Sequence, residues 1–442
     1  MKTRFAISGL LYAAVIGFLA NSFALVRQAP HVLFVMVPVF LAVNVFAGLW
    51  AVKLSDKRFK ICQHGTILLC AFYISVILST IFQIRFAIYT MPSDGWGVFW
   101  SLIYCIGVHF IVFWNGILCV YLTSTQLGIK LRTIGILCGM IPIANLIALY
   151  FIIKTTAGEC LLESKREQRN LLRKNDQVCA TKYPVLMVHG VFFRDSRFFN
   201  YWGRIPRELE ANGARIFYGN HPSAASVADS AALLKERIEE ILTQTGAEKV
   251  NIIAHSKGGL DCRYAISRLG ISQQVASLTT INTPHRGCLF ADYLLSTIPT
   301  GIKNTVAQTY NSTLRTLGEE NADFLAAVCD LTDAGCRALD AQMPTPEDVY
   351  CQSVGSVMKK AAGGQFPLNF SYHLVNHFSG ENDGLVSESS FAWGLRYTLL
   401  RPCGKRGISH GDMIDLNRTN IPGFDVREFY VELVSDLKNR GF

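Results

Sequence analysis

Five long stretches without a charged side chain occupy the first third of this 442-residue chain, and they limit what that third can fold into. About 20 consecutive apolar residues form a helix long enough to cross the hydrocarbon core of a bilayer, where a charged side chain is costly. The five stretches are Phe5–Val26, Val32–Val52, Ile61–Ile84, Gly97–Tyr121 and Ile134–Ile153. They predict an all-α transmembrane bundle of four or five spans over residues 1–153, with the lipid bilayer as its surroundings.

The first stretch has an alternative interpretation, because Lys2 and Arg4 precede it as basic residues precede the apolar core of a cleaved signal peptide. It is longer than such a core, and four further apolar stretches follow it. We therefore expect a multi-pass integral membrane protein. His64 and His109 lie within these stretches, and we expect them to face the bundle interior or an interface rather than to form a proton-transfer or metal site.

The charge of the chain is as uneven as its hydropathy. Residues 1–153 hold ten Lys and Arg but only two acidic residues, so eight of the nine net positive charges lie there. They form no dense basic run, which argues against a nucleic-acid partner. With the N-terminus in the cytoplasm, eight of the ten basic residues lie on the cytoplasmic side, where such residues are enriched.

The side of the membrane on which the C-terminal part lies stays open. Five complete spans would carry it out of the cytoplasm, yet basic residues that follow the fifth stretch, such as Lys165 and Arg166, favour the cytoplasm. Pro142 and Asn145 would suit a re-entrant fifth segment, which would return the chain to the cytoplasmic side. The two sets of charges therefore favour opposite orientations.

The composition and the hydropathy pattern of the chain change after the last apolar stretch. Glu159–Gln177 mixes both charges at helical spacing, which predicts a solvated connector helix within residues 154–182. From residue 183 short buried strands alternate with helical segments such as Asp229–Leu242. The strands are expected at Pro184–Val188, Arg215–Tyr218, Lys249–Ala254 and Val275–Ile281. This order predicts an α/β domain over residues 183–442, with a mostly parallel sheet, helices on both faces and its site at the carboxyl ends of the strands.

Two strand ends carry motifs for acyl chemistry. Ala254–Gly259 has the small-x-Ser-x-Gly pattern of a nucleophile elbow, which would expose Ser256 Oγ and aim the N–H of Lys257 at a developing oxyanion. The loop His189–Phe192 follows the first strand and would supply a second oxyanion N–H from Val191. The alternative for each is an ordinary glycine turn.

A serine becomes nucleophilic when a histidine accepts its proton and a carboxylate orients that histidine. In chains with a nucleophile elbow, the acid follows the serine and precedes the histidine along the sequence. Asp383 is the best acid, after Tyr372–Phe378, which we expect to be a strand. His410 is the only histidine that follows Asp383. We therefore expect Ser256, Asp383 and His410 to form a triad, and the earlier histidines to have loop or packing roles.

Six segments of the chain follow one another as in the bacterial triacylglycerol lipases of the Pseudomonas/Burkholderia type, which the chain resembles over roughly residues 182–417. They are TKYPVLMVHGVFF, NYWGRIPRELEANGARIFYGNHPSAASV, KVNIIAHSKGGLDCRYA, INTPHRGCLFADYL, ENDGLVSESS and ISHGDMIDLNR. The resemblance implies an α/β-hydrolase that acts on carboxylic esters of lipids, with Ser256, Asp383 and His410 as triad and the Val191 and Lys257 amides as oxyanion donors. Such lipases are generally secreted, whereas this chain has its own membrane segments, so we expect it in the bacterial cytoplasmic membrane.

The resemblance also implies a structural calcium held by two aspartates, of which Asp412 matches the second. No acidic residue occurs between Val349 and Gly380, where the first would lie, and capping of its own loop is the alternative role of Asp412. We therefore expect that no cofactor is required. The Lys257 ammonium is expected to be solvated or, alternatively, to favour anionic head groups. Cys288–Phe370 is the expected cap or lid.

The thirteen cysteines form no C-x-x-C motif, and a bond between Cys329 and Cys336 would require an extracytoplasmic domain. The sequence thus predicts a membrane-anchored serine hydrolase that cleaves lipid esters through an acyl-enzyme. Two alternatives stay open. The same triad could serve a lipid acyltransferase or phospholipase, or the chain could be a membrane protein with an inactive hydrolase domain.

Overall fold

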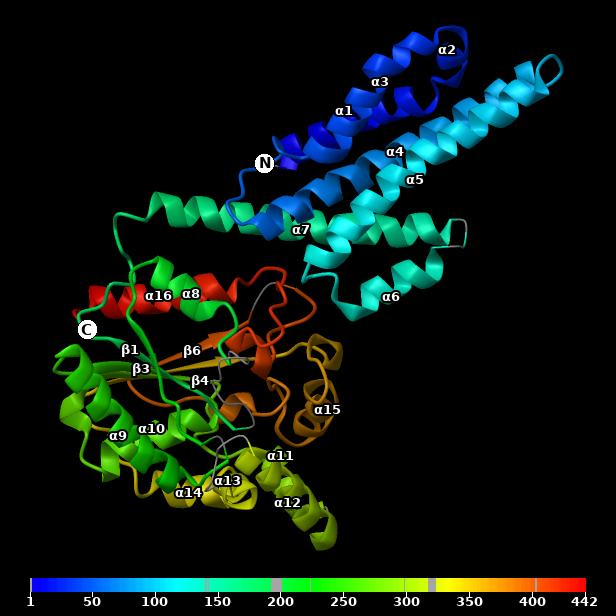
Figure 1. Ribbon diagram of the computed structural model, residues 1–442. Helices are drawn as coiled ribbons and strands as arrows, with labels where there is room; N and C mark the ends of the chain where they lie inside the picture. The colour runs from blue at the N-terminus through cyan, green and yellow to red at the C-terminus, as the bar shows by residue number, and fades with distance from the viewer. Residues whose placement is uncertain are drawn as a thin grey trace. The chain divides into compact units, whose positions relative to one another are not determined.

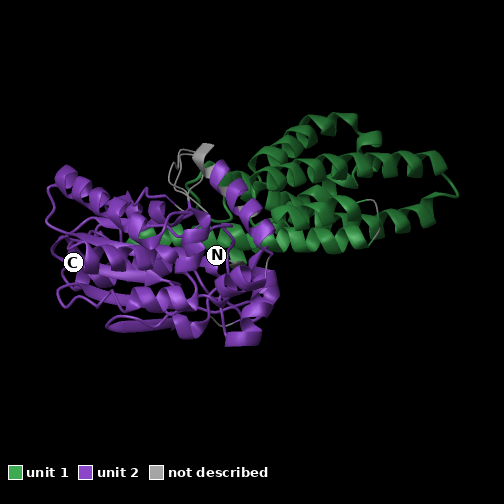
Figure 2. Cartoon of the chain, turned by 90° about the horizontal axis from the view of Figure 1, so that it is seen from below, with its two compact units in different colours: residues 1–172 green, residues 173–442 purple. Residues whose placement is uncertain are grey.

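The chain divides into two compact units, Met1–Leu172 and Arg173–Phe442, in the computed structural model (Figure 2). The structure describes residues 2–139, 141, 143–191, 201–222, 224–297, 299–316, 323–401 and 404–442. The first unit is helical and the second is built around a parallel sheet (Figure 1).

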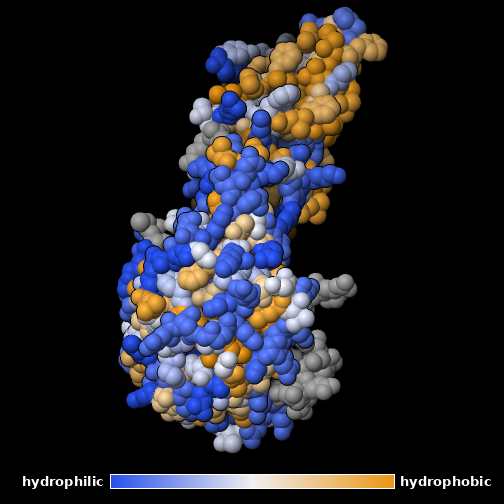
Figure 3. Space-filling model, turned by 90° about the vertical axis from the view of Figure 1, so that its left-hand side faces the viewer, coloured by the Kyte–Doolittle hydropathy of each residue, from blue (hydrophilic) through white to orange (hydrophobic). Residues whose placement is uncertain are grey.

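Four helices of the first unit are long and apolar enough to cross a membrane. The helices of this unit are α1 (Lys2–Ala20), α2 (Phe23–Gln28), α3 (Leu33–Phe46), α4 (Lys57–Thr90), α5 (Gly95–Thr123), α6 (Gly128–Cys138) and α7 (Ala144–Leu172). The four candidates are α1, α4, α5 and α7. Large apolar side chains such as Phe34 and Leu122 are exposed on this unit, and Figure 3 shows a broad hydrophobic surface over it. Exposed apolar surface of this kind suits lipid rather than water.

Three of the five predicted spans are not continuous helices. Residues 5–26 are divided between α1 and α2, with a turn at Asn21 and Ser22. Residues 32–52 form only the 14-residue helix α3 and a non-helical segment after it. The stretch 134–153 is divided between α6 and α7, with Gly139 and Pro142 between them in the sequence, and both residue types disfavour a helix interior. Pro142 itself lies outside the described residues.

The prediction of a separate, solvated connector helix is wrong for residues 159–172. Residues 159–172 belong to α7, which runs without interruption from Ala144. Glu159 is buried and accepts hydrogen bonds from Ser124 Oγ at 2.5 Å and from the Thr125 N–H at 3.3 Å. Arg58 lies 3.8 Å from the same carboxylate. A buried carboxylate is tolerated when donors surround it, and the sequence pattern could not show these donors.

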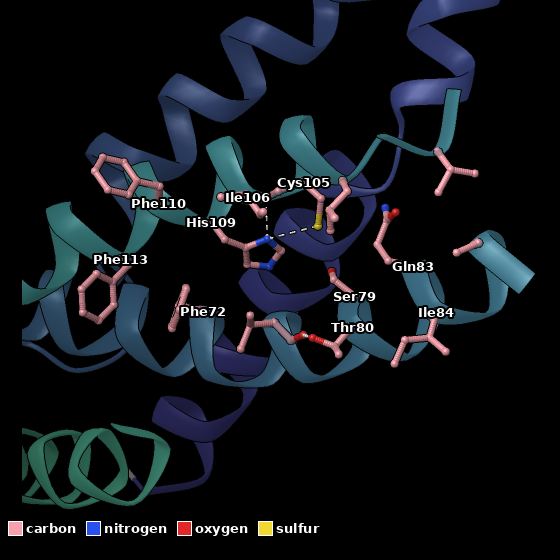
Figure 4. A pocket seen from close by; sticks show the side chains of 14 residues that line it. Phe72, Ser79, Thr80, Gln83, Ile84, Cys105, Ile106, His109, Phe110 and Phe113 are labelled. Carbon is pink, nitrogen blue, oxygen red and sulfur yellow. Dashed lines mark hydrogen bonds between the residues drawn. The ribbon is translucent and has the colours of Figure 1, made fainter. Parts of the chain in front are cut away.

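His109 lies inside the bundle, as expected. Its Nδ1 bonds to the Cys105 carbonyl at 2.9 Å, and its Nε2 lies 3.2 Å from Ser75 Oγ. Figure 4 shows His109 beside a cavity of about 500 Å³ between α4 and α5, with Gln83 at its other end. Gln83 Nε2 donates to Asn21 Oδ1 at 3.0 Å and thereby joins α4 to the segment after α1. These polar side chains hold helices together where apolar contact alone gives little specificity.

The second unit has a six-stranded sheet in the order β2-β1-β3-β4-β5-β6, with every neighbouring pair parallel. The strands are β1 (Val185–Val188), β2 (Ile216–Tyr218), β3 (Val250–His255), β4 (Val275–Ile281), β5 (Tyr350–Ser356) and β6 (Arg396–Leu400). The four strands expected from the sequence, β1 to β4, are confirmed. Such a sheet is stable only when helices cover both of its faces.

Alternate side chains of β1 enter two different cores. Met187 packs with α8 (Ile205–Ala211) and α16 (Val426–Asn439), whereas Leu186 packs with α9 (Val227–Thr245) and α10 (Lys257–Arg268). Figure 1 shows these two helix pairs on opposite faces of the sheet. The alternation of side chains along a strand explains how one buried strand serves both cores.

Two predictions about the later part of the chain are wrong. Tyr372–Phe378 lies within helix α15 (Leu368–Ser379), whose buried residues Ser371 and Val375 are spaced as on one helix face. The excursion predicted at Cys288–Phe370 contains the strand β5, which pairs with β4 and β6 within the sheet, so the excursion ends before Tyr350. Its helices are α11 (Leu289–Thr297), α12 (Thr300–Thr316), α13 (Phe324–Asp330) and α14 (Asp333–Asp340). Residues 298 and 317–322 of this excursion lie outside the described residues.

Candidate active site

Ser256 occupies the sharp turn between β3 and α10. Its backbone has φ +56° and ψ −133°, a conformation that L-residues seldom adopt. A Cβ on Gly258 would lie 2.3 Å from the His189 carbonyl oxygen, and one on Gly190 would lie 2.7 Å from the Ser256 Cβ. Both glycines are needed because the loop after β1 touches the backbone of the turn.

Asp383 and His410 form a close pair. Asp383 Oδ2 accepts from His410 Nδ1 at 2.6 Å and from Asn282 Nδ2 at 2.6 Å. Its other oxygen accepts from the N–H groups of Leu385 at 2.9 Å and Val386 at 2.8 Å. Asp383 is fully buried, so these four donors fix the orientation of its carboxylate and, through it, of the imidazole.

Ser256 and His410 line one cavity of about 480 Å³. Its other walls are mainly apolar and include Phe290 of α11 and Val328 of α13. No hydrogen bond joins Ser256 Oγ to the His410 ring in the described part of the chain. Contacts between a nucleophile and its base are often long in a free enzyme and tighten when substrate binds.

The structure places both predicted oxyanion donors beside this turn. Val191 follows β1 and lines the cavity, while Lys257 is the first residue of α10, where helix N–H groups have no acceptor within the helix. Phe192, the last residue of the predicted loop, lies outside the described residues.

Two residues that the sequence did not indicate, Tyr201 and His255, connect the loop after β1 to the loop that carries His410. Tyr201 Oη accepts from the Gly190 N–H at 3.0 Å and lies 2.7 Å from His255 Nδ1. His255 Nε2 lies 3.2 Å from the His410 carbonyl. Burial lowers the pKa of His255 well below its usual range, and the nearby His410 adds to this shift. A neutral His255 therefore accepts from the Tyr201 hydroxyl and donates to that carbonyl.

Neither prediction for the Lys257 side chain is correct. Its ammonium is buried and donates to Asp261 Oδ1 at 2.6 Å and to Ser230 Oγ at 3.0 Å. His221 Nε2 lies 3.4 Å from the other Asp261 oxygen, and the His221 ring stacks on His189 at 4.2 Å. The ion pair thus lies beneath the two backbone segments that carry the predicted oxyanion donors, and it does not face solvent or a head group.

Asp412 does not fit the role of a calcium ligand. Arg406 donates to both of its carboxylate oxygens, at 2.8 and 3.0 Å. Ser409 donates to Oδ2 through its N–H at 2.8 Å and its hydroxyl at 2.7 Å. The guanidinium already supplies the positive charge that a cation would bring, and no metal-binding group of three or more His, Cys, Asp or Glu occurs among the described residues. Asp412 therefore caps its own loop, which is the alternative role that the sequence allowed.

Cys329 and Cys336 do not form a disulfide. Both are free, and the buried Cys336 Sγ donates to the Pro284 and Asp330 carbonyls, each at 3.2 Å. The Cys336 thiol thus serves as a small buried donor, which agrees with the ordinary behaviour of free cysteine.

A profile of the α/β-hydrolase fold family matches residues 183–402, and the chain belongs to that family. Three of its relatives are triacylglycerol lipases. The lipase of Pseudomonas fragi is 33% identical over 304 residues, which cover 60% of this chain and 99% of the relative. The lipase of Vibrio cholerae is 36% identical over 234 residues, which cover 48% of this chain and 74% of the relative. The lipase of Pseudarthrobacter phenanthrenivorans is 28% identical over 314 residues, which cover 56% of this chain and 97% of the relative. The chain is thus a carboxylic ester hydrolase of the triacylglycerol lipase type.

Replacing Tyr201 by Phe should slow catalysis. The change leaves the Gly190 N–H and His255 Nδ1 without their shared partner but keeps the aromatic packing. Each of the two lost hydrogen bonds is worth roughly 1–2 kcal/mol, and a loss of that size in transition-state stabilisation, as the loop after β1 loosens, would lower kcat about tenfold. Steady-state kinetics on a soluble acyl ester measure this, and a lower kcat with KM unchanged is the expected result. Wild-type kinetics in Tyr201→Phe would contradict the connecting role.

Replacing Lys257 by Met should destabilise the hydrolase unit. The change leaves Asp261 buried without its ammonium partner, which costs about 3–5 kcal/mol when one member of a buried ion pair is removed. Denaturant unfolding of the full-length chain in detergent measures the loss. Lys235→Met, on the less buried α9 surface, is the control and should stay within about 0.5 kcal/mol of wild type. Equal stability of the two variants would contradict the role of the pair.

Buried histidines predict a loss of stability in acid. Burial is the main cause that lowers the pKa of His189 to about 3 and the pKa values of His255 and His285 well below their usual range. Each stays neutral in the folded chain but takes up a proton on unfolding below about pH 6.5. The free energy of unfolding therefore falls as the pH falls from about 6.5 toward 3, by roughly 1.4 kcal/mol per pH unit for each histidine.

Asp261 has the opposite effect on the free energy of unfolding over part of this pH range. Burial, opposed by Lys257, raises its pKa to about 6, so the folded state binds a proton that the unfolded state binds only at lower pH. It offsets one of the three histidines below about pH 6. Unfolding of the full-length chain at pH 7.5, 6.5 and 5.5 should still show decreasing stability, whereas constant or rising stability would contradict the prediction.

Proposed function

We propose that this chain is a membrane-anchored serine hydrolase that cleaves lipid esters with Ser256, His410 and Asp383. The observation that carries the proposal is the 2.6 Å bond between Asp383 and His410 beside the cavity that Ser256 also lines. A carboxylate in this position holds the imidazole with Nδ1 protonated and leaves Nε2 as the base.

Acylation begins when His410 Nε2 accepts the Ser256 proton and Oγ attacks the ester carbonyl carbon. The carbonyl oxygen becomes an oxyanion, to which the Val191 and Lys257 N–H groups donate. When the tetrahedral intermediate collapses, the C–O bond to the alcohol breaks and His410 returns its proton to the leaving oxygen. The alcohol departs and the acyl group stays on Ser256.

Deacylation repeats these steps with water. His410 Nε2 accepts a proton from water, whose oxygen attacks the acyl carbonyl carbon. The second tetrahedral intermediate releases the carboxylic acid, and the proton returns to Ser256 Oγ. Asp383 stabilises the imidazolium in both halves of the reaction. The Leu385 and Val386 N–H groups donate to its other oxygen and keep the carboxylate fixed while charge develops.

Two features support a lipid ester as the substrate. The cavity beside Ser256 is lined mainly by apolar side chains from α11, α13 and the segment 365–368, which suits an acyl chain. The helices α11 to α14 between β4 and β5 are the proposed cap over it. The four apolar helices of the first unit would keep the hydrolase at a bilayer, where esters of fatty acids are concentrated.

Replacing Ser256 by Ala should abolish hydrolysis of a chromogenic acyl ester in a detergent extract, because the nucleophile is lost. A fall of at least about 10³-fold is expected. Ser272→Ala, which changes a serine outside the cavity, is the matched control and should keep wild-type activity. Undiminished hydrolysis by Ser256→Ala would contradict the proposal, and analysis of the released fatty acid separates hydrolysis from acyl transfer.

A further inference from the structure

Asn282 lies directly after β4, at the carboxyl end of the strand and beside the proposed triad. Its backbone has φ +48°, in the left-handed region that asparagine enters more readily than most residues. Its N–H donates to the Val354 carbonyl on β5 at 2.8 Å, and its side chain is fully buried. The sheet therefore fixes the backbone from which the Asn282 amide projects.

The Asn282 amide uses both of its N–H hydrogens. Nδ2 lies 2.6 Å from Asp383 Oδ2 and 2.8 Å from Ser356 Oγ, and it donates to both. The Ser356 hydroxyl in turn donates to the Ile408 carbonyl at 3.3 Å, two residues before His410. One amide group thus joins the ends of β4 and β5 to the proposed acid and to the loop that carries the proposed base.

Asn282 and His410 donate to the same oxygen of Asp383. Both distances to Oδ2 are 2.6 Å, while the other oxygen accepts from two backbone N–H groups. Of these four donors, the imidazole is the one that can take up a proton and become a cation. A carboxylate oxygen that already accepts from a neutral donor attracts that cation less strongly, because its negative charge is shared between two hydrogen bonds.

The other ionisable groups near the His410 ring add little charge. The His255 ring lies 4.4 Å away between centroids, and its pKa is lowered well below the usual range, mainly by burial, so it stays neutral. Asp412, on the same loop as His410, is paired with Arg406. The strength with which Asp383 attracts the imidazolium therefore sets the pH below which the proposed base is lost.

We propose that Asn282 is a positioning residue for the proposed base, and that it keeps His410 uncharged to a lower pH than Asp383 alone would allow. The amide holds the carboxylate toward the imidazole and takes part of the negative charge that would otherwise stabilise the imidazolium. Asn282 thus acts on the reaction through Asp383 rather than by contact with the ester. This proposal rests on the proposed function, because it requires His410 to act as the base.

The acid limb of the pH profile of kcat/KM tests the proposal, because it reports the protonation of the base in the free enzyme. Asn282→Gly removes the amide, and glycine adopts the left-handed backbone without strain. Hydrolysis of a soluble ester by the full-length chain in detergent is measured from about pH 5 to about pH 9, the range around the titration of a histidine. The acid limb of Asn282→Gly should lie about one pH unit above that of the wild type, which is a tenfold gain in proton affinity.

Ser277→Ala is the matched control. Ser277 lies on the same strand, nearer its start, and its hydroxyl donates to Asn251 Oδ1 at 2.7 Å. Each variant loses buried hydrogen bonding on β4, but Asn282→Gly alone should move the acid limb. The downfield proton resonance of the bond between His410 and Asp383 follows the same titration without substrate, so a slow variant stays measurable.

An acid limb that stays in place or moves to lower pH in Asn282→Gly would overturn the proposal, and so would an equal shift in Ser277→Ala. A fall in rate or stability without a shift would do the same, because an asparagine with a merely structural role would cause it. Ser256→Ala, measured alongside, reports the proposed function separately. Hydrolysis that depends on Ser256 but has an unmoved acid limb contradicts the role of Asn282 alone, whereas hydrolysis independent of Ser256 overturns both.

Discussion

The approach of the loop after β1 to the turn at Ser256 is the contact on which the hydrolase site depends. The His189 carbonyl lies so close to Gly258 that no side chain fits between them. This contact brings Val191, which follows β1, and Lys257, which begins α10, close to Ser256. The strained backbone of Ser256 persists because packing on both sides over-determines it. The Tyr201–His255 chain then extends the same fixed geometry to the His410 backbone.

Both units place charge in their interior and surround it with donors. Lys257 and Asp261 form a buried pair in the hydrolase, and Glu159 receives hydroxyl and amide donors in the helical unit. Charges of this kind add little net stability, but they are costly to leave unpaired. They therefore favour the native packing over any alternative packing that would leave one of these charges without its partners. In the hydrolase the pair lies beneath the segments of the proposed oxyanion donors, where small shifts of the backbone would affect the proposed chemistry.

Much of the fold could be predicted because its signals are local. Buried apolar strands with glycine after them indicated β1 and β3, and chain order selected His410 once Asp383 was chosen. The strand β5 escaped notice because Gln352 and Ser353 are polar yet buried, and the Gln352 amide donates to Thr279 on the neighbouring strand. Tyr201 and the partner of Lys257 were missed for the same reason. Their roles depend on contacts between distant segments, which no local pattern records.

Mapping the residue that reacts with a fluorophosphonate probe tests the central claim most directly. The full-length chain is labelled in native membranes and digested, and the modified peptide is sequenced by mass spectrometry. We expect a single adduct on Ser256 that forms rapidly in the wild type and very slowly when His410 is replaced by Ala, because the proposed base is then missing. An adduct on another residue, or ester hydrolysis that continues with Ser256 unmodified, would contradict it.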